Sequence, residues 1–112
     1  VYSNKPATID KSIEYQQKAL FFSNASHDTD IIGTSNANLG ECYVTKAREE
    51  LKDTTKFLEA KVHLDSALFY LMKAREFYKV SQSPNLPYAL NVIGKIYRMK
   101  RDYKLSIDFY YK

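Results

Sequence analysis

Apolar residues recur at intervals of three and four positions along most of this chain, with polar residues between them. That spacing puts the apolar side chains on one face of a helix, whereas a half-buried strand would alternate strictly. Four segments show the pattern most clearly: 9–22, 31–47, 57–78 and 88–99. The pattern predicts an all-α protein.

Three polar clusters interrupt the apolar pattern. Residues 23–30 and 81–87 are rich in Ser, Asn, Asp and Pro, and a weaker break lies at 100–102. Such clusters favour turns, so they divide the chain into about five helices. We expect Thr29 or Asp30 to cap the second helix. Because the connections are short, neighbouring helices should be antiparallel.

Two short motifs occur more than once. The first has a small residue, an aromatic residue three places later and Lys six places later, and it occurs at 12–19, 67–74 and 106–112. The second reads apolar-Gly-x-x-Tyr and occurs at 39–43 and 93–97. The two motifs alternate along the chain, which indicates a repeated helix pair.

These motifs resemble the tetratricopeptide repeat, which carries Leu-Gly-x-x-Tyr in its first helix and Ala-x-x-x-aromatic in its second. The best unit is 89–112, where Gly94 and Ser106 are twelve residues apart, as the family's pattern requires. Because both residues are small, the two helices could approach closely, with Tyr97 beside them. The resemblance implies an antiparallel helix-pair solenoid, a right-handed superhelix of about two and a half repeats.

The middle unit departs from the family's pattern, because Ala67 lies 27 positions after Gly40. The inserted stretch, centred on 46–61, is charged and helix-prone, so we expect extended helices. We therefore divide the chain, 1–112, into a second helix of a truncated repeat at 9–26, a long middle repeat at 30–81 and a truncated last repeat at 87–112. The residues expected to pack the repeats are Leu39, Gly40, Tyr43, Ala67, Leu71, Ala74, Ile93, Gly94, Tyr97, Ser106 and Tyr110.

The ends of the chain suggest a piece of a longer array. The chain begins with Val1 rather than Met, opens on a second helix without its partner, and ends on the apolar and aromatic residues 107–111. Repeat arrays normally end in polar caps. Exposed array ends could therefore drive self-association.

Composition is that of a globular domain, with 45% hydrophobic and 27% charged residues but only 3 Gly and 3 Pro. Disordered and collagen-like classes are thereby excluded, and the single Cys42 excludes an internal disulfide. No apolar run approaches the roughly 18 residues of a membrane span, so we expect no membrane contact from this segment. We favour the cytoplasm, with the periplasm as the alternative if the parent protein is membrane-anchored.

No catalytic, cofactor or metal site is predicted, and we do not expect an enzyme. His27, Asp28 and Asp30 lack a second cluster of ligands, so a solvated loop with a helix-capping Asp explains them better. We expect His63 on the surface or in a helix seam, and Cys42 as a half-buried packing residue.

The formal net charge of +4 is local. Residues 1–84 carry 11 basic and 11 acidic side chains, so the excess lies in 85–112, and it is densest at 98–104. A basic stretch with an aromatic residue can contact nucleic acid, which is the alternative function. We favour a solvated turn between two repeat helices at 98–104, with contact to an acidic protein partner as another reading, and disfavour nucleic acid as a partner.

In tetratricopeptide arrays, the first helix of each pair lines an inner groove that binds extended or helical segments of partner proteins. The resemblance therefore implies a protein or peptide partner and a scaffolding role, as in the repeat regions of bacterial histidine-kinase-like or helix-turn-helix regulators. The presence of Glu41 does not match the doubly basic clamp that holds a C-terminal carboxylate in some members, which disfavours chaperone tails. The expected groove residues are Asn38, Glu41, Thr45, Tyr88, Asn91, Lys95 and Arg98.

Overall fold

The computed structural model describes the backbone of residues 6–110 and the side chains of residues 8–101. It contains four long helices, α1 (Pro6–Ser26), α2 (Thr29–Glu50), α3 (Phe57–Ser81) and α4 (Leu86–Tyr110), and one 3₁₀ turn at Thr54–Lys56. Residues 6–110 include no strand, so the predicted all-α class is confirmed.

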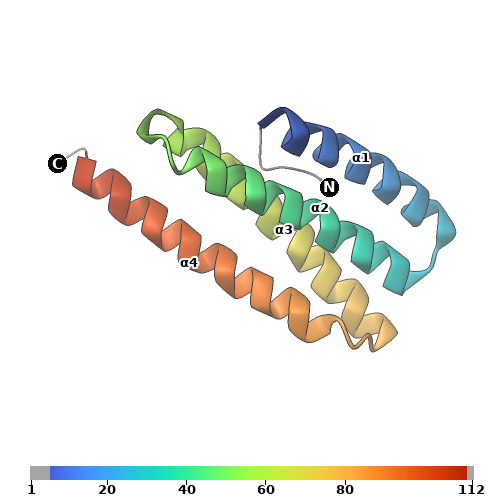
Figure 1. The fold of residues 1–112 in the computed structure, drawn as a ribbon. Helices are drawn as coiled ribbons and strands as arrows, with labels where there is room; N and C mark the ends of the chain where they lie inside the picture. Colours follow the sequence, from blue (N-terminus) through green and yellow to red (C-terminus); the bar gives the residue numbers. More distant parts are fainter. Residues whose placement is uncertain (1–5, 111–112) are drawn as a thin grey trace.

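Each helix packs against the next one along the chain: α1 on α2, α2 on α3, and α3 on α4. The short links make these neighbours antiparallel, and Figure 1 shows the four helices lying side by side in an elongated body. Its principal extents are 48 × 27 × 20 Å. Because α2 and α4 are two helices apart, they run in the same direction, and they also touch.

The most extensive contact joins α2 to α3. A Cβ built on Gly40 would lie 1.9 Å from Leu71 Cδ2 and 3.1 Å from the Ala67 carbonyl oxygen. Only a residue without a side chain therefore allows this approach. The buried stripe of α3 alternates large and small side chains at intervals of three and four: Phe57, Ala60, Leu64, Ala67, Leu71, Ala74 and Tyr78.

The two outer helices cover this central pair. On one side, Ile9 and Ile13 of α1 pack with Leu39 of α2, and the hydroxyls of Ser23 and Ser35 lie 2.5 Å apart. On the other side, α4 buries four apolar residues in the core that α2 and α3 form: Ala89, Val92, Ile93 and Ile96.

The start of α2 differs from the prediction. Asp28 is the capping residue, and its Oδ1 accepts hydrogen bonds from the backbone N–H groups of Asp30 at 3.0 Å and Ile31 at 3.1 Å. Thr29 and Asp30 are already helical. The prediction was wrong by one or two positions, because a capping side chain must reach the free N–H groups two and three residues ahead of it.

The predicted break at 100–102 is also wrong. The backbone of α4 continues without interruption from Leu86 to Tyr110, so residues 6–110 form four long helices rather than five, with no turn at 98–104. Lys, Arg and Met have high helix propensity, and this stretch contains neither Gly nor Pro. Charge alone did not end the helix.

An ion pair connects α4 to α3. Lys100 Nζ donates a hydrogen bond of 2.5 Å to Asp65 Oδ1, and Lys61 Nζ lies 3.5 Å from the other carboxylate oxygen. The hydrogen bond from Lys100 is the main cause that holds the pKa of Asp65 below its ordinary value.

Asp65→Asn should lower the free energy of unfolding near neutral pH by less than about 1 kcal/mol, because this pair is partly exposed. The folded-state pKa of Asp65 lies below its unfolded value of about 3.9, so the stabilisation is complete above that pH. It is lost as the pH falls through the folded-state pKa. Urea unfolding of both proteins along a pH series measures this. A difference that persists unchanged into strong acid would contradict the assignment.

Candidate partner-binding groove

The groove residues expected on α4 share one face of that helix. Tyr88, Asn91, Lys95 and Arg98 follow one another at intervals of three and four, and all four side chains are exposed. On α2, Asn38 is exposed, whereas Glu41 and Thr45 are half-buried. Two rows of polar side chains therefore lie on two parallel helices.

The two rows come close at one point. The Tyr88 phenol of α4 lies near the Glu41 carboxylate of α2. Partial burial and then this carboxylate raise the pKa of Tyr88 well above its ordinary value. A raised pKa favours the neutral phenol, which avoids a second negative charge beside Glu41.

Further polar groups line the same end of the bundle. Tyr78 of α3 is buried, and its hydroxyl donates to Thr34 Oγ1 at 3.1 Å. Burial is the main cause that raises the pKa of Tyr78. The Thr45 hydroxyl donates to the Glu41 carbonyl oxygen of its own helix at 3.1 Å. Thr45 therefore uses its donor internally and can offer a ligand only an acceptor.

The other end of the α4 row is basic. Among residues 8–101, neither Lys95 nor Arg98 forms an ion pair with another side chain. Lys100 differs, because Asp65 already binds it. The candidate groove thus offers two amides at Asn38 and Asn91, and then two cations.

The residues expected to pack repeats fall into two groups. Leu39, Gly40, Ala67, Leu71, Ala74 and Ile93 are buried, and Tyr43 is half-buried. Gly94 and Tyr97 are exposed, and a Cβ on Gly94 would meet nothing within 4 Å. Both lie outside the buried face of α4, so Gly94 mediates no close approach. The side chains of Ser106 and Tyr110 lie outside the described residues.

Tyr43 belongs to an aromatic stack between α2 and α3. Its ring lies 5.9 Å from the rings of both His63 and Tyr70, in stacked orientation. His63 Nδ1 lies 2.6 Å from Glu50 Oε1, which places His63 in the helix seam. Cys42 is half-buried, and burial followed by the charge of Glu41 raises the pKa of its thiol. A raised pKa disfavours the nucleophilic thiolate.

The described part of the chain shows neither a cluster of metal ligands nor a membrane span. It contains no group of three or more His, Cys, Asp and Glu residues that could hold a metal ion. None of its helices is both long enough and apolar enough to cross a membrane.

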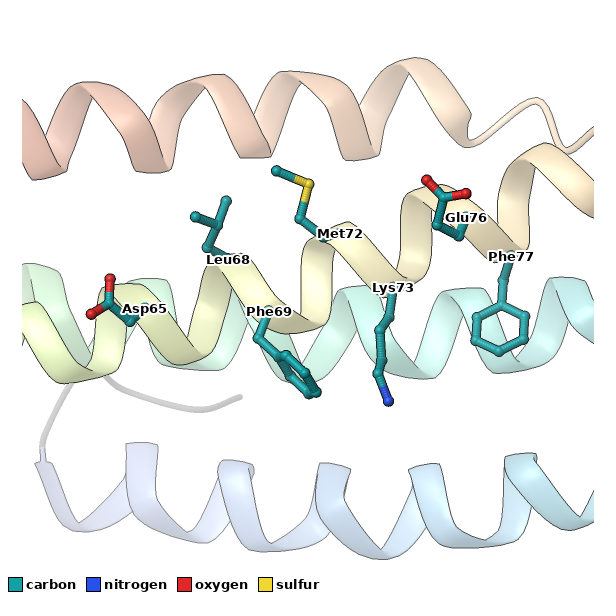
Figure 2. Close-up of a pocket in the computed structure, with 7 residues that line it drawn as sticks. All are labelled: Asp65, Leu68, Phe69, Met72, Lys73, Glu76 and Phe77. Carbon is teal, nitrogen blue, oxygen red and sulfur yellow. The ribbon is translucent and has the colours of Figure 1, made fainter.

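A surface that the sequence analysis did not single out lies on the outer face of α3. Figure 2 shows seven α3 side chains around an open depression of about 630 Å³, with Leu68 and Met72 directed toward α4 and Phe69 directed toward α1. The signal was present in the sequence as a second apolar stripe in 57–80. The stripe that faces α2 already accounts for an amphipathic helix, so the second stripe was not noticed.

Comparison with known proteins supplies no family or relative for this chain. No protein-family model, curated protein or solved structure matches it. Functional inferences therefore rest on the chain's own residues and on the resemblance of its motifs.

Proposed function

We propose that the chain is a protein-interaction module that binds an extended or helical segment of a partner along the face shared by α2 and α4. The observation that carries this proposal is the contact between the parallel helices α2 and α4, which places Tyr88 beside Glu41. Asn91, Lys95 and Arg98 are exposed on the same face of α4.

The side chains on this face suit a peptide ligand. Asn38 and Asn91 can each donate to and accept from a peptide backbone. Tyr88 offers an aromatic contact at low entropic cost. Lys95 and Arg98 add two cations at one end, which favour a segment with an acidic side chain there.

The resemblance to tetratricopeptide repeats supports the same surface. In that family the first helices of successive pairs line the groove, and α2 and α4 carry the two Leu-Gly-x-x-Tyr-like motifs at 39–43 and 93–97. The unbroken α4 departs from the pattern in the last unit. On the same resemblance, we propose a bacterial signalling protein as the parent, with this segment as its regulatory scaffold.

The groove can be tested with a displayed peptide library selected on the wild-type protein. The Asn91→Ala/Lys95→Glu variant should bind the selected peptides at least about tenfold more weakly, because it removes an amide and reverses a charge at the groove. Fluorescence anisotropy with labelled peptides measures the dissociation constants.

A matched control is Asn24→Ala/Lys11→Glu, which makes the same two changes at exposed positions of α1. The control should bind like the wild type. If both variants lost the same affinity for the peptides, or neither lost any, the groove assignment would be wrong. Binding to single-stranded nucleic acid that weakens steeply with salt would favour the alternative function instead.

A further inference from the structure

The outer face of α3 carries an apolar strip that no described helix covers. Leu58, Val62, Phe69 and Val80 are all exposed. Asp65, Met72 and Glu76 lie between them. All seven positions follow one another at intervals of three and four residues, so they form one continuous stripe along the helix. The stripe lies opposite the buried stripe that packs against α2, so it faces away from the core.

The middle of this strip is the open depression drawn in Figure 2. Phe69 lies near its centre with its side chain 54% exposed, and its ring packs edge-to-face against Tyr70 at 5.1 Å. Lys73 Nζ lies 4.8 Å from the Phe69 ring centroid. Contiguous apolar surface of this kind on a soluble protein marks an interaction site.

The charges around Phe69 match those of a second copy of α3 that lies on the strip. Asp65 lies four residues before Phe69, and Lys73 lies four residues after it. If two copies of α3 cross antiparallel at Phe69, each residue faces the one equally far on the other side of position 69. Asp65, which also binds Lys100 of its own chain, then faces Lys73 of the second copy, and the symmetry makes this pair twice. The apolar ends also match, because Leu58 faces Val80.

The least favourable charge in this arrangement is that of Glu76, which faces Val62 of the second copy. Its carboxylate already accepts a 3.0 Å hydrogen bond from Arg75 Nη2 and lies 3.9 Å from Lys79 Nζ. These contacts keep the charge compensated at the edge of the strip, so Glu76 need not be buried unpaired.

We propose that the chain forms an antiparallel homodimer through the outer face of α3, with the two helices crossing at Phe69. The strip from Leu58 to Val80 is about 33 Å long at about 1.5 Å per residue, so a single helix from each copy supplies the contact. Such an interface belongs at the small end of specific interfaces, and the dimer should depend on concentration. It leaves the α2–α4 face free, so it is independent of the proposed groove.

Sedimentation equilibrium of the wild-type chain should show a monomer–dimer exchange across the micromolar range. Phe69→Glu should raise the dissociation constant at least about tenfold, because it places two carboxylates at the crossing point. The matched control is Tyr97→Glu on α4, where the replaced side chain is 51% exposed. It should dimerise like the wild type. Circular dichroism checks that each variant keeps its helix content.

A charge reversal tests the orientation of the two copies. Lys73→Asp should weaken the dimer several-fold, because two like charges then face each other. The double variant Asp65→Lys/Lys73→Asp should recover most of that loss, and Asp65→Lys alone controls for the lost contact with Lys100. A wild-type chain that stays monomeric would overturn the proposal, and so would a double variant no better than Lys73→Asp. Loss of the dimer in Tyr97→Glu but not in Phe69→Glu would move the association to the exposed face of α4.

Discussion

Leu71→Ala should lower the free energy of unfolding by about 2 to 5 kcal/mol, the range for buried leucines that leave a cavity. Leu71 is completely buried, and its Cδ2 occupies the space above Gly40. Urea unfolding followed by the helical circular-dichroism signal measures the loss. A cost below about 1 kcal/mol would mean that α2 and α3 close the gap, which would contradict a tightly packed seam.

The pairing of Gly40 with Leu71 makes a sharper prediction. Gly40→Ala alone should destabilise the protein by about 1 to 3 kcal/mol through overpacking, despite the better helix propensity of Ala. In the double variant Gly40→Ala/Leu71→Ala, the new methyl group enters the space that Leu71 vacates. The double variant should therefore be more stable than the sum of the single effects by about 1 kcal/mol or more.

Gly94→Ala is the matched control for Gly40→Ala, because its Cβ would meet nothing within 4 Å. It should stabilise the protein by up to about 1 kcal/mol through helix propensity alone. If Gly40→Ala and Gly94→Ala changed stability equally, or if the double-mutant cycle were additive, Gly40 would not mediate the close approach.

The second large effect is expected at Tyr78, the bulkiest of the fully buried side chains. Its ring lies against Gly33, where a Cβ would come within 2.9 Å of it. Tyr78→Ala should lower the free energy of unfolding by about 3 to 5 kcal/mol, as for other buried aromatic residues. The same urea unfolding measures it.

Tyr78→Phe separates the ring from its hydroxyl. The hydrogen bond to Thr34 is lost while the packing remains, so we expect a cost of about 0.5 to 1.5 kcal/mol. If Phe cost as much as Ala, the hydroxyl rather than the ring would anchor the C-terminal end of α3 to α2.

Much of the helical architecture could be predicted from local pattern. The three- and four-residue spacing in 31–47 and 57–78 corresponds to α2 and α3, and the small residues Gly40 and Ala67 meet in their seam. The polar clusters at 23–30 and 81–87 contain the connections between helices. These features are visible in sequence because periodicity and turn chemistry are properties of adjacent residues.

The candidate groove was predictable only in part. Spacing placed Tyr88, Asn91 and Lys95 on one face of a helix, but the proximity of Tyr88 to Glu41 required α2 and α4 to be neighbours. That adjacency depends on how both helices pack with α3. The exposed strip on α3 could not be found for a related reason, since a second apolar stripe is buried or exposed according to what covers it.

The sequence by itself determined the all-α class, the positions of the connections after α1 and α3, and the small residues of the α2–α3 seam, because each follows from helix periodicity or local backbone preference. Tertiary structure decided which faces are covered. Leu71 is buried against Gly40, whereas Phe69 and Tyr97 are exposed. Helix α4 continues without a break through the charged stretch at 100–102. Burial depends on neighbours distant in sequence, and no local pattern records which of two apolar faces they cover.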